Sequence, residues 1–157
     1  MKKVLIVFLF GLCLLTSCSD QKKIQIEIEP DSIVSIAISG YPTMFANGDS
    51  IDSTTDINKI TSITSSFNKL TLTFYKTKEE WDKLSPASTK RQKDTITFYN
   101  AKKECVERIT RVNNSEGTFI IKLLDQEVYT VSEEDYTKLN TIFDTLIEEA
   151  VDGRLNS

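Results

Sequence analysis

Hydrophobic residues follow three different patterns along this chain. Residues 4–15 form one unbroken apolar run. From residue 24 onward, short segments alternate apolar and polar residues, which is the period of half-buried strands. In two other segments the apolar residues recur every three or four positions, which is typical of an amphipathic helix. The chain therefore divides into an apolar leader and a region with the pattern of a folded domain.

The alternating segments predict seven strands. The clearest is Ile24 to Glu29, in which three isoleucines alternate with polar residues until Pro30 stops the strand. In the second, Val34, Ile36 and Ile38 share one face, and Gly40-Tyr41-Pro42 after it predicts a turn. A short hairpin around Asn47-Gly48-Asp49 is compatible with the sequence. The other predicted strands are 70–75, 95–99, 106–112, 118–124 and 128–131.

Two helices are predicted, at about 55–68 and 132–150. The first follows a Ser53 to Asp56 capping-box spacing, and the second follows Ser132 with Asp135 at the box position. A single further helical turn is compatible with Glu79 to Leu84. The stripe of the last helix contains Tyr136, Leu139, Phe143, Leu146 and Ile147.

The order of these elements predicts the fold class. Strands joined by short turns pair antiparallel, and the helices are segregated along the sequence, which favours an α+β fold. We expect a single domain over residues 24–152, built on one twisted antiparallel sheet of about six or seven strands. One or both helices should cover one face of that sheet.

The apolar leader has the features of an export signal. Lys2-Lys3 precedes it, Thr16-Ser17-Cys18 follows it, and its twelve residues are fewer than the ~20 needed to span a bilayer. The string Leu15-Thr16-Ser17-Cys18 resembles the lipobox of bacterial lipoprotein precursors. The resemblance implies cleavage of residues 1–17 and a diacylglycerol on Cys18. The domain would then be anchored to a bacterial membrane on its extracytoplasmic side, with residues 18–23 as a short tether.

The remainder of the chain also resembles a known group in its layout. Over residues 24–131 it is similar to small uncharacterised lipoprotein domains of Gram-positive bacteria. These have a strand pair near the tether, a helix rich in Ile-x-x-Ile and then a meander of strands. This resemblance favours the α+β fold and implies no activity.

The net charge of the chain limits the classes of partner that it can attract. Cleavage before Cys18 would remove two of the 19 basic side chains and change the net charge of the chain from −4 to −6. A mildly acidic protein has no electrostatic attraction to nucleic acid or to anionic lipid. We therefore expect no nucleic-acid partner, and the attached lipid must hold the protein at the membrane.

Residues with catalytic chemistry are scarce. The chain has no histidine, which excludes Ser-His-Asp and Cys-His catalysis as well as histidine-based zinc sites. Its five glycines are not clustered as a phosphate-binding loop requires. Cys13 lies in the leader and Cys18 would bear lipid, so Cys105 has no partner for a disulfide and is interpreted as a small, partly buried side chain. We expect no catalytic residue, metal or cofactor.

Two groups of oxygen-bearing side chains are the candidates for such chemistry. Glu27 and Glu29 share one face of the first strand at ~6–7 Å, a separation compatible with glycosidase acids, although charges on a solvated strand face give the simpler interpretation. Asn47, Asp49 and Asp52 are rich in oxygen but lack the closing glutamate of a calcium loop, so a turn and a helix cap are favoured.

One segment is a candidate partner patch. Tyr41, Met44 and Phe45 lie in an uncharged stretch, Tyr41 to Ala46, which either folds back on the core or presents an apolar surface to a partner. Trp81 is interpreted as a plug over the edge of the core, with a partner hot spot as the alternative. Lys90-Arg91-Lys93 is a solvated loop or a weak contact with lipid headgroups.

These features favour a membrane-anchored, non-catalytic binding or interaction module with an envelope protein as its partner. One alternative is a carboxylate-dependent hydrolase of cell-wall sugars that uses Glu27 and Glu29, with Tyr99 or Tyr129 as a stacking platform. A second is an accessory or inhibitor subunit of an envelope complex.

Overall fold

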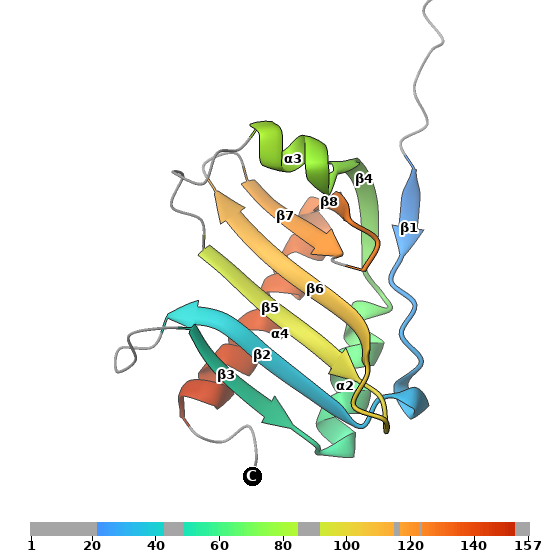
Figure 1. Cartoon of the computed structure of the whole chain (residues 1–157), viewed down its shortest axis with the longest axis vertical. Helices are drawn as coiled ribbons and strands as arrows, with labels where there is room; N and C mark the ends of the chain where they lie inside the picture. Colours follow the sequence, from blue (N-terminus) through green and yellow to red (C-terminus); the bar gives the residue numbers. More distant parts are fainter. Residues whose placement is uncertain (1–21, 43–48, 85–91, 115–116, 123, 153–157) are drawn as a thin grey trace, which may run out of the picture.

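The computed structural model describes residues 22–42, 49–84, 92–114, 117–122 and 124–152. Within these ranges, one antiparallel sheet contains eight strands in the order β1-β4-β8-β7-β6-β5-β2-β3 (Figure 1). The strands are β1 (Lys23–Gln25), β2 (Ser35–Pro42), β3 (Asp49–Thr54), β4 (Thr71–Thr77), β5 (Gln92–Tyr99), β6 (Cys105–Asn114), β7 (Gly117–Lys122) and β8 (Glu127–Val131). The helices are α2 (Ile57–Phe67), α3 (Lys78–Leu84) and α4 (Glu133–Val151), with a short 3-10 helix η1 (Pro30–Ser32).

The α+β class and the single antiparallel sheet are therefore confirmed, but the number of strands was underestimated. The additional strand is β3, at the edge of the sheet, where Ile36 to Ser39 of β2 pair with Ile51 to Thr54. Its sequence, DSIDST, contains one apolar residue and so has no alternation that could predict a strand. Backbone pairing with β2 forms this strand. The described residues also form three α-helices where two were predicted, because the helical turn considered at Glu79 to Leu84 is part of α3.

Both long helices lie close to their predicted positions. Ser132 caps α4 as expected, since its side chain accepts a hydrogen bond from the Asp135 N–H at 3.1 Å. The cap of α2 is not Ser53, which belongs to β3, but Asp56, which accepts from the Asn58 N–H at 2.8 Å. A carboxylate at this position satisfies an N–H that lacks a partner within the helix.

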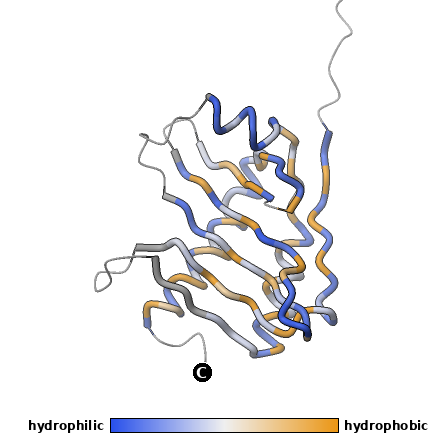
Figure 2. The backbone as a smooth tube through the Cα atoms, viewed as in Figure 1, coloured by the Kyte–Doolittle hydropathy of each residue, from blue (hydrophilic) through white to orange (hydrophobic). Residues whose placement is uncertain are grey.

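The main core lies between the sheet and the pair α2 and α4. Alternate residues of the strands are buried in this core. Figure 2 shows the accompanying changes of hydropathy along the strands. Phe67 of α2 contacts Phe98 of β5 and Phe143 of α4 edge-on, with ring centroids 5.7 and 6.1 Å apart. The phenylalanine ring thus joins both helices to the sheet at one point.

A smaller cluster covers part of the opposite face. Trp81 of α3 is 1% exposed and packs with Val112, Phe119, Ile121 and Val128. These strand residues are out of phase with those of the main core, so α3 lies on the other side of the sheet. Trp81 is therefore buried, as its interpretation as a plug requires, but it covers a separate cluster rather than the edge of the main core.

The segment before η1 alternates as predicted, although only Lys23–Gln25 pairs as a strand. Ile26 and Ile28 are buried in the main core. Beyond β1, the Asn68 side chain replaces a neighbouring strand, because its amide donates to the Ile28 carbonyl at 2.7 Å and its oxygen accepts from the Ile28 N–H at 2.9 Å. The Asn68 side chain, at the end of α2, thereby holds the backbone between β1 and η1 in place.

Three local predictions were wrong. Gly40-Tyr41-Pro42 is not a turn but the irregular end of β2, where Gly40 has φ +88° and a Cβ there would lie 2.4 Å from the Lys93 carbonyl oxygen. The expected core residues Val34 and Tyr136 are each 43% exposed. Ile33 is buried in place of Val34 because the strand begins after residue 34, so the alternation is shifted there.

Candidate functional site

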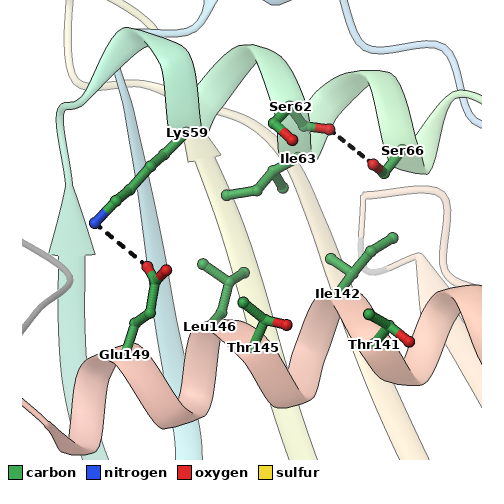
Figure 3. Close-up of a pocket in the computed structure, with 9 residues that line it drawn as sticks. All are labelled: Lys59, Ser62, Ile63, Ser66, Thr141, Ile142, Thr145, Leu146 and Glu149. Carbon is green, nitrogen blue, oxygen red and sulfur yellow. Dashed lines mark hydrogen bonds and ion pairs between the residues drawn. The ribbon is translucent and has the colours of Figure 1, made fainter.

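The facing sides of α2 and α4 leave an apolar groove, which we call the helix groove (Figure 3). It encloses about 240 Å³. Ile63, Ile142 and Leu146 contribute its apolar surface. Hydroxyl side chains border it on both helices, namely Ser62, Ser66, Thr141 and Thr145. The groove therefore offers buried apolar contact with a rim of small polar groups.

The small side chains along the rim account for this open space. Serine and threonine do not fill the volume that leucine or phenylalanine would occupy between two helices that both pack on one core. The Ser66 hydroxyl donates to the Ser62 carbonyl at 2.8 Å, and the Thr141 hydroxyl donates to the Thr137 carbonyl at 2.9 Å (Figure 3 shows the first). Each of these two hydroxyls uses its proton within its own helix.

One end of the helix groove is closed by an ion pair. Lys59 Nζ lies 3.3 Å from Glu149 Oε2, and both side chains are about one quarter exposed (Figure 3). A partly exposed pair of this kind contributes at most ~1 kcal/mol to stability. Its main effect is to place a charged boundary at the end of an apolar floor.

The flank formed by α4 is strongly acidic. Between Glu133 and Asp152 the sequence has seven carboxylates and one lysine, whereas α2 has one lysine and no acid. A hydrogen bond from the Thr71 backbone N–H lowers the pKa of the Asp135 carboxyl. Burial acts to raise this pKa, but the hydrogen bonds outweigh it. Glu148 and Asp152 are exposed beside the groove end. Because Glu149 is paired with Lys59, the exposed Glu148 contributes negative charge beside this end of the groove.

A buried charge network holds α4 to the sheet. Arg111 donates from Nε and Nη2 to Asp94 Oδ2 at 3.1 and 2.7 Å, and from Nη1 to Asn140 and Asp144 at 2.9 and 2.8 Å. The guanidinium carbon also lies 4.8 Å from the centre of the Phe143 ring. Sequence reasoning missed this network. The signal was present, because Asp94 and Arg111 occupy inward positions of their strands.

A second depression, the polar cleft, lies between residues 22–27, around β1, and the β7–β8 turn. It encloses about 690 Å³ and is lined by Lys22, Ile24, Gln25, Glu27, Lys122, Asp125, Glu127 and Tyr129. Lys122 contacts Asp125 at 2.6 Å and Glu107 at 3.2 Å. Burial acts to lower the pKa of Lys122, but these carboxylates outweigh it and raise the value.

The phenol in the polar cleft is also engaged. Tyr129 Oη donates to Glu127, and burial together with this carboxylate raises the pKa of the phenol. The Tyr129 ring is fully buried against Phe74, with centroids 6.1 Å apart. It therefore offers no exposed face for stacking on a sugar. Tyr99, the alternative platform, is half-buried on β5.

The other sequence candidates have varied outcomes. Glu27 and Glu29 are both exposed on the segment after β1, beside an open depression that includes Asn68 and Val106. Cys105 is a free, partly buried cysteine, as expected. Among the described residues no group of three or more acidic or cysteine side chains could hold a metal ion.

Several candidates lie outside the described residues. These include the leader, Cys18, Met44 and Phe45, as well as Asn47, Lys90 and Arg91. The backbone of Tyr41 belongs to β2, but its side chain is outside the description, as are those of Asp49 and Asp52. The partner patch and the calcium alternative consequently stay predictions.

Within the described ranges, no helix combines the length and hydrophobicity needed to cross a membrane. Comparison with protein families, curated sequences and solved structures finds no significant match to this chain.

Proposed function

We propose that the chain is a lipoprotein, anchored by lipid on Cys18 to the extracytoplasmic side of a bacterial membrane, and that it acts as a non-catalytic binding module. The helix groove is the proposed binding surface. The observation that favours this function most is the concave apolar floor of the groove, which the partly buried Ile63 and Ile142 and the buried Leu146 form. Concave, mostly apolar sites are typical of binding sites.

The short tether supports a position in which the helix groove is accessible to other envelope proteins. Four residues separate Cys18 from Lys23, the first residue of β1, so the start of β1 lies within ~18 Å of the acylated cysteine. In Figure 1 the chain enters the sheet beside α3, and α2 lies at the opposite end of the domain. The helix groove, bounded by α2, would thus lie away from the bilayer and face other envelope proteins.

The use of the charged groups also favours binding over catalysis. Lys122 and Tyr129 are engaged by carboxylates in the polar cleft, and Arg111 is engaged by Asp94 beneath α4. These contacts stabilise the fold and its turns. Glu27 and Glu29, the acids of the hydrolase alternative, are exposed to water rather than enclosed.

Two measurements test the proposal. Anchoring is tested by Cys18→Ser, which should move the protein from the membrane fraction to the soluble or secreted fraction. Binding is tested with a photo-crosslinking amino acid at Thr145, in the groove, and at Thr137, an exposed position on α4 outside it. A discrete product from position 145 alone supports the proposal. Equal labelling at both positions, or none at 145, contradicts it.

A further inference from the structure

We infer that the helix groove binds a basic amphipathic helix of a partner protein. This inference rests on the proposed binding function and specifies the class of partner. It follows from the volume of the groove, from the hydrogen bonds of its rim and from the charge of α4.

The volume favours side chains over a whole small molecule. The groove encloses about 240 Å³, below the ~300–1,000 Å³ typical of sites that enclose a drug-sized ligand. It is bounded by α2, whose eleven residues extend ~16 Å at the helical rise. An elongated ligand that inserts a few aliphatic side chains onto Ile63, Ile142 and Leu146 matches this shape.

The rim favours a helical ligand over an extended one. An extended peptide needs partners for its backbone N–H and carbonyl groups, which sheet edges normally supply. Here the Ser66 and Thr141 hydroxyls donate within their own helices, and the walls are helices whose backbone groups are already bonded. A helix satisfies its backbone internally and presents apolar residues three and four positions apart. It therefore needs little beyond apolar contact from the groove.

The charges beside the helix groove determine which sign of charge the partner should have. Several carboxylates of α4 are already paired with cations: Asp144 with Arg111, and Glu134 and Asp135 with Lys138. At the groove end Glu149 is paired with Lys59 of α2. Exposed Glu148 is available to a cation on an incoming helix. Lysine or arginine beside the apolar stripe of the partner would be attracted, whereas an acidic helix would be repelled.

The test uses defined peptides and the full acylated chain in phosphatidylcholine nanodiscs, with empty nanodiscs as the blank. The basic probe is an amphipathic peptide with leucine on one face and lysine on its flanks. One comparison peptide has glutamate for lysine, and another has the same composition with the leucine spacing scrambled. We expect the basic probe to bind about tenfold tighter than either comparison peptide, a difference of ~1.4 kcal/mol. Binding should weaken as salt is raised.

Matched variants localise the binding. Thr145→Arg places a bulky cation in the groove and should weaken binding at least about fivefold, a difference of ~1 kcal/mol. Thr137→Arg is the same substitution on the same helix outside the groove, so it should leave the affinity unchanged. Circular dichroism checks that both variants fold.

The competing occupants give distinct results. Equal affinity for the acidic or scrambled peptide, or binding unaffected by Thr145→Arg, would overturn the inference. Displacement of the basic probe by a second copy of the chain or by dodecanoate would do the same, assigning the groove to self-association or to an acyl chain. A specific crosslink at position 145 together with any of these results leaves the proposed binding function intact.

Discussion

Removing Asp94 tests the buried charge network that fixes α4. Asp94 is fully buried, and the Arg111 side chain is 3% exposed. Asp94→Ala would leave a buried guanidinium without its two hydrogen bonds to the carboxylate on the sheet. Loss of one partner of a buried pair costs ~3–5 kcal/mol. Arg111 keeps Asn140 and Asp144, so we expect the free energy of unfolding to fall by about 3 kcal/mol, the lower end of that range.

Two comparison variants separate this effect from a general loss of contacts. The Asp144 side chain is 57% exposed, so Asp144→Ala should lower the free energy of unfolding by less than ~1 kcal/mol. In the double variant Asp94→Leu with Arg111→Met no buried charge is left unpaired. Its stability should lie within ~1 kcal/mol of the unmodified chain, or exceed it.

Urea unfolding of a soluble chain starting at Lys22, followed by fluorescence of the single tryptophan, measures these differences. Trp81 is buried, so its emission reports the loss of the fold. The free energies come from linear extrapolation. A loss for Asp94→Ala no greater than that for Asp144→Ala would refute the reasoning, as would a double variant less stable than Asp94→Ala alone.

Three further substitutions have specific expected outcomes. Asn68→Ala removes both side-chain bonds to Ile28 and should lower the free energy of unfolding by ~1–3 kcal/mol, with faster hydrogen exchange at the Ile28 amide; unchanged exchange would contradict this. Gly40→Ala should cost at least ~1 kcal/mol, seen as a lower Tm, since its Cβ would meet the Lys93 carbonyl at positive φ; an unchanged Tm would exclude the close approach. Because hydrogen bonding lowers the pKa of Asp135, its ionised form stabilises the fold above the unfolded pKa, and this is lost as the pH falls through the folded pKa. The Tm difference between the unmodified chain and Asp135→Asn should thus be constant near neutral pH and shrink below about pH 5, and a difference that grows with acidity would contradict the assignment.

Much of the fold could be predicted because its strands bury one face each. The alternation at Ile26 and Ile28 identified inward residues correctly even where the chain no longer pairs as a strand. The Ser132 cap of α4 was predicted from local hydrogen-bonding chemistry, which depends little on distant contacts. The turn signal at Asn47-Gly48-Asp49 was compatible with a hairpin before β3, but the strand itself could not be placed from its side chains, because backbone pairing rather than burial of alternate side chains forms it.

The site was harder to predict than the fold. The helix groove depends on the relative position of α2 and α4, which are about seventy-five residues apart in sequence, and periodicity within one helix says nothing of its neighbour. The buried pair was accessible in principle, since Asp94 and Arg111 are inward residues opposite each other on adjacent strands. Recognising them required the register between β5 and β6, which the sequence leaves open.

The most direct test of the helix groove is a methyl NMR titration of the chain with the basic amphipathic peptide. We predict chemical-shift changes concentrated at the methyl groups of Ile63, Ile142 and Leu146, which contribute the apolar surface of the groove. The methyl groups of Ile121 and Val128, which pack with Trp81 on the opposite face of the sheet, should be unaffected. Saturable binding with shifts confined to that opposite face, or spread evenly over both, would contradict the assignment.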